Sequence, residues 1–369
     1  MLPHQQEMKY HSIIKLKVKI YNYLKSTAVT RPNVKPLIIN GDMQVAQRST
    51  SETGITGSGY HVTDRNKMTI GSIGTYTITQ ESLTSGAAYE AGFSKAFRVD
   101  CTTADASPSA GDEISFDYKI EGQDLQLFKK GTSSAETFTL AFWIKSNKTG
   151  VGQVNLQDRD NSRMCSATYT ISSADTWEHK VLNYAADTTG VFGNDNLESL
   201  RIDFWLDSGS SYTSGATPTA WEATATADKN ASGALDIAGH TDNDWAITGL
   251  QLEVGTYTSS TLPPFQHETY GDNLLRCFRY FYKDNDGTNT ELMSGLLPLD
   301  GSHSKRVWVQ FKTPMRATPA QENSSWSGGG TIASNASQFL NKYSAEAYAR
   351  DNDDTNAIYY DGSEWNAEL

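Results

Sequence analysis

The side chains that could carry out chemistry are mostly acidic, and they are spread over the whole chain. A glycosidase needs two carboxylates about 5–10 Å apart, one on each side of the bond that it cleaves. Glu178, which follows Trp177, and Asp203, which lies in a run of Ile and Phe, differ most from the other acids. The sequence does not show whether these two carboxylates lie close together in space. We therefore expect solvated strand faces, with a hydrolytic pair as the weaker alternative.

Other catalytic patterns are missing from the sequence. It contains no Gly-x-Ser-x-Gly, no phosphate-binding loop and no Gly-x-Gly-x-x-Gly, and its seven histidines are scattered through polar segments. We therefore predict that the chain is not an enzyme and has no catalytic residues.

One acidic turn could hold a metal ion. The run Asp284-Asn285-Asp286-Gly287 offers oxygen donors at alternate positions, which suits Ca²⁺. An EF-hand loop has its glycine at the sixth position, whereas here it is the fourth. A solvated turn is thus the expectation, Asp284 and Asp286 are weak candidates for a structural Ca²⁺, and no other cofactor is predicted.

Aromatic rings in polar segments are the residues most suited to binding sugars. A ring face stacks on the apolar face of a sugar, while nearby amides and carboxylates accept its hydroxyls. Trp326, in the segment SSWSGGG, is hard to explain as a core residue. Packing, or contacts between copies of the chain, is the alternative for the whole set, and Trp221 could equally plug its long loop. The candidates are Trp326, Tyr359, Tyr360, Trp365, Trp221 and Tyr212.

Charge separates a short basic segment from an acidic body. The 369 residues carry a formal net charge of −12. Residues 1–36 hold seven Lys/Arg and one Asp/Glu, giving +6, so the remaining 24 basic and 42 acidic residues give −18. An acidic body argues against nucleic acid as a partner. There is no apolar run of 18 residues and no signal-peptide pattern, so we predict neither a membrane span nor secretion.

The three cysteines, Cys101, Cys165 and Cys277, are odd in number and far apart, without metal-site spacing. We expect reduced, mostly buried thiols in a protein that is assembled in a cytoplasm.

Residues 1–36 form a candidate attachment arm. Apolar and basic residues alternate through Ile14, Lys15, Leu16, Lys17, Val18, Lys19 and Ile20, which is a strand pattern, with a helix as the alternative. The following Arg-Pro-Asn-Val-Lys-Pro run, residues 31–36, is typical of an extended linker. A flexible tail or an additional edge strand is the other interpretation.

Residues 37–268 show the pattern of a single β-sandwich. Period-2 runs bounded by turn residues predict strands at 37–40, 67–70, 76–80, 95–100, 113–120, 138–146, 166–172, 178–184, 199–206 and 245–254. The clearest runs place alternate residues of 138–144 and of 200–206 on an apolar face. Long loops are expected at 100–112, 156–164 and 207–244. The fold prediction is an all-β jelly roll.

Residues 269–369 indicate a second, smaller β-sandwich. Pro263 and Pro264 end the first domain, and a short helix with Asp272 as its N-cap is expected next. Strands are predicted at 291–299, 305–313, 345–350 and 357–361, and a loop at 324–330. In the second of these strands Val307, Val309 and Phe311 alternate with Trp308, Gln310 and Lys312.

Three phrases carry a resemblance to a known family. They are LIINGDMQVAQR at 37–48, LQLEVGTYTSSTLPPFQHETYGDNLLRCFRYF at 250–281 and FKTPMRATP at 311–319. They resemble the opening phrase, the domain join and the C-terminal phrase of bacteriophage tail-fibre and virion-surface proteins. The runs FTLAFWIKS, TWEHKVLNY and LRIDFWLDSG also look like strands of jelly rolls of the carbohydrate-binding-module type.

The resemblance implies a structural protein of a tailed-phage virion. The first hypothesis is a tail fibre or receptor-binding protein, attached to other virion proteins through residues 1–36 and binding host surface glycan through its last 100 residues. Proteins of this kind are typically homotrimers. The chain lacks a recognisable tail-adaptor domain, so a capsid-attached head fibre or decoration protein is the alternative. A polysaccharide-degrading enzyme is the third hypothesis.

Overall fold

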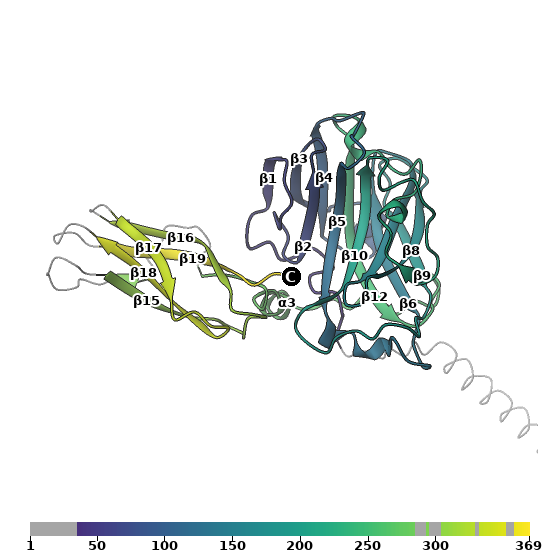
Figure 1. Ribbon diagram of the computed structural model, residues 1–369. Coiled ribbons are helices and arrows are strands. Elements are labelled where there is room, and N and C mark those ends of the chain that lie inside the picture. Colours follow the sequence, from purple (N-terminus) through teal and green to yellow (C-terminus); the bar gives the residue numbers. More distant parts are fainter. Residues whose placement is uncertain (1–34, 285–292, 295–303, 329–331, 352–357) are drawn as a thin grey trace, which may run out of the picture.

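The computed structural model describes residues 35–284, 293–294, 304–328, 332–351 and 358–369. The predicted arm strand at 14–20 therefore lies outside the described residues, as does most of the strand predicted at 291–299. Two β-sandwiches lie side by side, with helix α3 and the C-terminal residues between them (Figure 1). The all-β prediction, a jelly roll followed by a smaller sandwich, is confirmed.

Two six-stranded antiparallel sheets form the jelly roll. Sheet A has the order β1-β3-β4-β12-β6-β9, and sheet B the order β11-β8-β7-β10-β5-β2. The bounds in sheet A are β1 Ser51–Ile55, β3 Thr75–Ser82, β4 Lys95–Thr103, β12 Asp244–Val254, β6 Phe138–Lys145 and β9 Glu178–Tyr184. Those in sheet B are β11 Glu222–Ala223, β8 Arg163–Ile171, β7 Gly150–Asp158, β10 Glu198–Ser208, β5 Glu113–Glu121 and β2 Asn66–Gly71. The short helices are α2 Ala87–Glu90, η1 Gly122–Asp124, η2 Gln126–Phe128, η3 Thr226–Asp228 and η4 Ile237–Gly239.

Alternation of apolar residues along the strands builds the core between the two sheets. Phe138, Phe142 and Ile144 of β6 and Ile202 and Phe204 of β10 are fully buried, as their period-2 spacing predicts. Phe142 and Phe204 meet edge to face, with ring centroids 4.9 Å apart. The residues that alternate with them, such as Ala141 and Trp143 in β6 and Asp203 and Trp205 in β10, are not part of this core cluster.

Several local predictions in the jelly roll are wrong. Residues 37–40 form a turn instead of a strand, and β1, β7 and the two-residue β11 are strands that were not predicted. The loop expected at 156–164 is only the short link between β7 and β8. Strand β7 gives a weak hydrophobicity pattern because it supplies only Val154 and Leu156 to the core, while its outward residues Gln153, Asn155 and Gln157 are buried amides.

The smaller sandwich packs sheet C against sheet D. Sheet C contains β13 Phe281–Lys283, β14 Met293–Ser294, β16 Ala320–Gly328 and β19 Ile358–Asn366. Sheet D has the order β15-β18-β17, with β15 Ser304–Gln310, β18 Ser344–Asp351 and β17 Ile332–Gln338. Its core includes Val307, Val309, Phe311, Trp326 and Trp365. Strand β16 corrects the loop predicted at 324–330, because this Ser- and Gly-rich segment pairs with β19.

Helix α3, Tyr270–Cys277, connects the two sandwiches. Its N-cap is Thr269, whose hydroxyl accepts the amide of Asp272 at 3.3 Å and donates to the Asp272 carboxylate at 2.6 Å. The predicted helix is therefore present, but Asp272 lies in its first turn and is not its N-cap.

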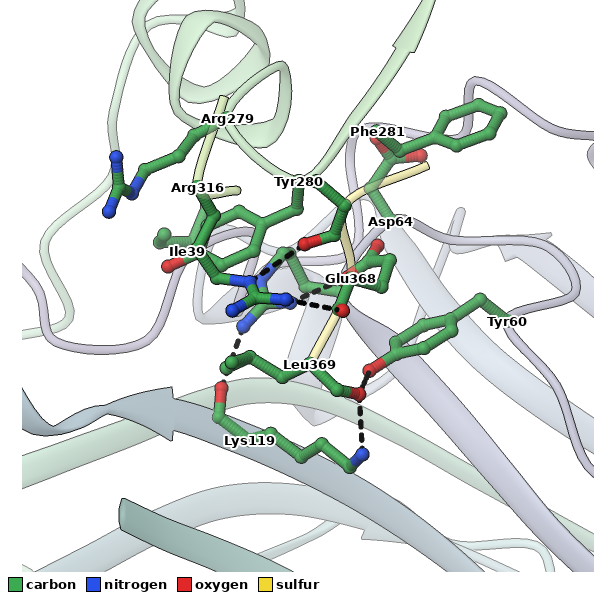
Figure 2. A network of polar contacts seen from close by, with 12 residues as sticks. Ile39, Tyr60, Asp64, Lys119, Arg279, Tyr280, Phe281, Arg316, Glu368 and Leu369 are labelled. Atoms are coloured by element: carbon green, nitrogen blue, oxygen red, sulfur yellow. Dashed lines mark hydrogen bonds and ion pairs between the residues drawn. The ribbon is translucent and has the colours of Figure 1, made fainter. Parts of the chain in front are cut away.

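The C-terminal residues are clamped between the two sandwiches (Figure 2). Arg65 of the jelly roll is 1% exposed, forms an ion pair with Glu368 and lies 3.5 Å above the centre of the Tyr280 ring. The Tyr60 hydroxyl and the Lys119 ammonium both donate to the backbone oxygen of Leu369. We call these contacts, together with those of the three phrases below, the joint.

The three phrases that carried the family resemblance meet at the joint. In the first phrase, the backbone amide of Asn40 donates to the Asn273 side chain of α3, and the Arg48 guanidinium lies 3.7 Å above the Phe281 ring. Arg316 of the third phrase bonds the backbone oxygens of Ala367, Glu368 and Asn196. Segments far apart in sequence thus fix the C-terminal sandwich against the jelly roll.

Position 41, in the first phrase, needs a glycine because the backbone of β12 lies too close to leave room for a side chain. A Cβ at this position would lie 2.3 Å from the backbone oxygen of Leu250 in β12, and the amide of Leu250 bonds the Gly41 oxygen at 2.9 Å. The first phrase is therefore held tightly against the strand that precedes α3.

Cys101, Cys165 and Cys277 are free and buried, as expected. In the part of the chain that the structure describes, no helix is long and apolar enough to cross a membrane.

Candidate functional site

The outer face of sheet D presents large aromatic rings to solvent. Val307 and Val309 of β15 face the core, so Trp308 between them faces outward and is 61% exposed. Phe339, the residue after β17, is 66% exposed, and its ring centroid lies 6.1 Å from that of Trp308 at 25° between planes. Tyr343, at the other end of the same hairpin loop, is 55% exposed. We call these three rings the aromatic platform.

A buried carboxylate lies beside the aromatic platform. Glu346 of β18 is the cross-strand partner of Trp308 and is only 2% exposed. One of its carboxylate oxygens accepts a hydrogen bond from Arg306 at 3.1 Å. The other oxygen is buried and has no hydrogen-bond partner among the described residues. Arg306 itself is half-exposed, so its charge reaches the solvent.

The aromatic platform is placed at the end of sheet D nearest the joint. The amide of Met315 bonds the backbone oxygen of Lys342, in the loop that carries Phe339 and Tyr343. The amide of Arg316 bonds the backbone oxygen of Arg279, just after α3. Residues 315 and 316 therefore link the hairpin loop that carries Phe339 and Tyr343 to the joint.

Chemically, this face can hold a ligand. Exposed aromatic groups of this size are unusual on a protein surface and mark binding sites. The apolar ring faces fit the C–H face of a pyranose, and the flanking polar side chains offer hydrogen bonds.

Three of the sequence-predicted sugar-binding residues are in the core instead. Trp326 is 9% exposed, Tyr360 1% and Trp365 fully buried. Trp326 and Tyr360 are cross-strand partners in β16 and β19, and their rings pack with centroids 4.8 Å apart. None of the three presents an open ring face, because the Ser- and Gly-rich segment folds inward as a strand. Tyr359 lies in β19, and its side chain is outside the described part.

Trp221 and Tyr212 belong to the long loop and pack onto the jelly roll. Trp221 is 8% exposed, lies 5.7 Å from Phe138 and donates its indole N–H to the oxygen of Ala185 at 2.7 Å. It therefore plugs the loop, the alternative that the sequence left open. Tyr212 is half-buried, with its ring 4.9 Å from that of Trp205.

This loop also packs on the outer face of sheet B, over β7. The amide groups of Gln153 and Asn155 on β7 donate to the backbone oxygens of Asp228 and Lys229 at 2.7 and 2.8 Å. The amides in this part of the sheet are thus hydrogen-bonded to the chain itself.

Asp203 pairs with Asp117, a residue that the sequence did not single out. They are cross-strand neighbours on β10 and β5, and they are 3% and 1% exposed. Burial, together with the nearby Asp117 carboxylate, raises the pKa of Asp203 well above its usual range. Two acids with so little exposure offer no access to a substrate.

Glu178, the other acid considered for hydrolysis, lies in β9 of sheet A, whereas Asp203 lies in sheet B. It accepts the amides of Ser172 and Ser173 at 2.8 Å and pairs with Lys180. Burial alone would raise the pKa of Glu178, but these hydrogen bonds lower it. Glu178 and Asp203 therefore do not converge.

Asp284 uses both carboxylate oxygens within the chain. They accept the Tyr360 hydroxyl at 2.7 Å and the amide of Ser363 at 2.5 Å. Asp286 and the attachment residues Ile14 to Ile20 lie outside the described residues. Within the described ranges, no group of three or more His, Cys, Asp or Glu could hold a metal ion.

The signal for Trp308 was present in the sequence. Its neighbours Val307, Val309 and Phe311 alternate with it, which places its ring on the outer face. Phe339 and Tyr343 gave no comparable signal, because they lie in a hairpin loop.

No family model matches the sequence, and no curated protein matches it. Among solved structures, the enzymatically active domain of bacteriophage CBA120 tailspike protein 4 matches 59% of this chain and 21% of its own, at 14% identity and a TM-score of 0.31. The module TmCBM61, in complex with β-1,4-galactotriose, matches 60% and 99%, at 8% identity and a TM-score of 0.28. The family 11 carbohydrate-binding module of Clostridium thermocellum Lic26A-Cel5E matches 62% and 99%, at 10% identity and a TM-score of 0.27. At these scores the likeness identifies no family, and the function has to be argued from the chain's own residues.

Proposed function

We propose that this chain is a non-catalytic attachment protein of a phage particle and binds host surface glycan through the outer face of sheet D. The aromatic platform beside the buried Glu346 is the observation that supports the binding part of the proposal. The phage part comes from the resemblance of the three phrases. With it come attachment to other virion proteins through residues 1–36 and assembly as a homotrimer.

The absence of catalysis in this proposal is supported by the geometry of the acids. The Asp117–Asp203 pair is buried, and Glu178 lies in the other sheet. A binding protein needs only the exposed rings and the hydrogen-bonding groups around them. The hairpin loop that carries Phe339 and Tyr343 is also hydrogen-bonded to Met315, next to Arg316 of the joint.

Replacing Trp308 by alanine tests the proposal. We expect affinity for extracted host surface polysaccharide to fall at least about tenfold, because a central exposed tryptophan commonly supplies much of a binding energy. Isothermal titration calorimetry on the full chain measures this. The matched control is Tyr89→Ala, which removes a ring that is 46% exposed on α2 of the jelly roll. Its affinity should not change.

Two results would contradict the proposal. A Trp308→Ala, Phe339→Ala double variant that binds polysaccharide as well as the unmodified chain would exclude the aromatic platform as the site. Release of reducing sugar by the unmodified chain, lost on Asp203→Asn, would favour the enzyme instead.

A further inference from the structure

The aromatic platform lies in a basic region of an acidic protein. Residues 304–312 and 339–351, which build β15, β18 and the hairpin loop, contain five Lys/Arg and two Asp/Glu, a net charge of +3. Strands β13, β16 and β19 of sheet C contain one lysine and three acids, a net charge of −2. The two faces of one small sandwich thus differ in sign, while residues 37–369 as a whole carry −18.

The basic groups around the rings are open to solvent. Lys312 and Lys342 are exposed, and the Lys342 ammonium lies 5.2 Å from the centre of the Tyr343 ring. Arg306 is half-exposed, while the acid that it pairs with, Glu346, is buried. Positive charge therefore faces outward, and the negative charge of this pair is withdrawn from the surface.

We propose, on the basis of the function proposed above, that the glycan bound at the aromatic platform is an acidic polysaccharide. Ring faces would take the apolar side of its sugars, and Arg306, Lys312 and Lys342 would pair with carboxylate or phosphate groups along it. Charge complementarity of this kind also speeds encounter with an anionic cell surface.

A glycan fits these observations better than a nucleic acid does. Single-stranded nucleic acids also bind to rings flanked by basic groups, but they carry a negative charge at every nucleotide and need a long positive track. Here three exposed bases stand on a body of charge −18. A polysaccharide with widely spaced anionic groups meets the local positive charge without the repulsion of the rest of the molecule.

The test compares acidic and neutral glycans on the same variants. The probes are polygalacturonate for carboxylates, a phosphomannan for phosphates, dextran as the neutral polysaccharide, and poly(dT). The double variant Lys312→Gln, Lys342→Gln removes two charges and leaves the Arg306–Glu346 pair intact. Its matched control is Lys129→Gln, Lys148→Gln, which removes two lysines of the jelly roll that are 53% and 35% exposed.

We expect the unmodified chain to bind one or both acidic glycans more tightly than dextran. In the Lys312→Gln, Lys342→Gln variant this affinity should fall about tenfold, with the control unchanged. Raising the salt concentration from roughly 50 to roughly 500 mM should weaken the binding of the acidic glycan and leave the binding of dextran unchanged. A difference between the two acidic probes identifies the anionic group.

The outcomes separate the two proposals. Equal binding of dextran and acidic glycans, lost in Trp308→Ala, would overturn the acidic specificity and support the glycan-binding function. Glycan binding that is unchanged in Trp308→Ala, or no glycan binding, would overturn both. Tighter binding of poly(dT) than of either acidic glycan, dependent on Trp308, would overturn the inference in favour of nucleic acid.

Discussion

Two aspartates hold their protons more tightly in the folded chain than in the unfolded one. Asp64 is buried beside the joint, and its carboxylate accepts the amide of Gln47 at 2.9 Å. Asp207, at the end of β10, accepts the amide of Ala238 at 3.1 Å. Burial raises the pKa of each to about 6, against the smaller opposing effects of Arg48 and the backbone amides.

This shift predicts that the protein is more stable in mild acid. Because the folded pKa is raised, the folded state binds more protons between about pH 4 and pH 7, and the free energy of unfolding rises as the pH falls through this window. Together the two groups should raise the free energy of unfolding by about 2–3 kcal/mol when the pH is lowered from about 7.5 to about 5. Burial alone would also raise the pKa of Asp187 and Glu198, but their basic partners lower it, and that stability is lost only below about pH 4.

Urea unfolding at the two pH values measures the effect. We expect a higher midpoint at the lower pH and a smaller difference in Asp64→Asn, which mimics the protonated acid. A lower midpoint at the lower pH would show that other groups dominate.

At the residue scale, the sequence shows which aromatic residues the chain contains, but it does not always show which of them are exposed. Alternation with Val307 and Val309 is enough to put Trp308 outside. For Trp326, a Ser- and Gly-rich setting suggested exposure, yet a strand partner on β19 draws the ring inward. Which side of a strand is buried depends on pairing across the sheet, and pairing between distant segments is not written in local composition.

At the scale of elements, strands with apolar alternation could be predicted, and strands rich in amides or Ser could not. β9 has the predicted bounds of 178–184, and β6 and β10 differ by one or two residues. β7 carries amides whose partners are a distant loop, and β16 carries Ser and Gly. Each strand places few large apolar residues in a core, Val154 and Leu156 in β7 and Trp326 in β16, so neither shows a long period-2 run.

Helix α3 provides a prediction at this scale. Asn273, 2% exposed, accepts the amide of Asn40 at 3.1 Å and donates to Asp42 at 3.2 Å. Asn273→Ala leaves that buried amide without a partner, so the free energy of unfolding should fall by about 1–3 kcal/mol. Urea denaturation measures it, with Leu275→Ala as the matched control on the same helix, since Leu275 is 45% exposed. Equal midpoints for both variants would mean that the amide finds another partner.

At the scale of the whole molecule, the two sandwiches are joined by charged side chains, several of them buried. Besides the Arg65–Glu368 pair, Glu121 of β5 is fully buried and accepts hydrogen bonds from Arg279 at 2.8 Å and from the Tyr280 hydroxyl at 2.5 Å. The three phrases could be picked out in the sequence, but their meeting in space could not be predicted from it. The second phrase contacts the first through Asn273 and Phe281, and the backbone oxygen of its Arg279 accepts the amide of Arg316 in the third.

The ion pair between Arg65 and Glu368 gives the sharpest test of the joint. Glu368→Ala leaves a guanidinium that is 1% exposed without its carboxylate, and breaking a buried pair in this way costs about 3–5 kcal/mol. Arg65 keeps the backbone oxygen of Lys119 and the rings of Tyr280 and Tyr118. We expect the two sandwiches to separate, which small-angle scattering would show as a larger radius of gyration, and to unfold in two transitions.

The matched control is Glu364→Ala, which removes an acid four residues earlier. Glu364 pairs with Lys283 at 3.0 Å, and both side chains are partly exposed, so its loss should cost no more than about 1 kcal/mol and leave the scattering unchanged. If Glu368→Ala behaves like this control, the apolar contacts of Ile39, Cys277 and Tyr280 hold the joint by themselves. If the sandwiches separate, Glu368→Ala should also weaken glycan binding only slightly, because sheet D keeps its own core and its rings.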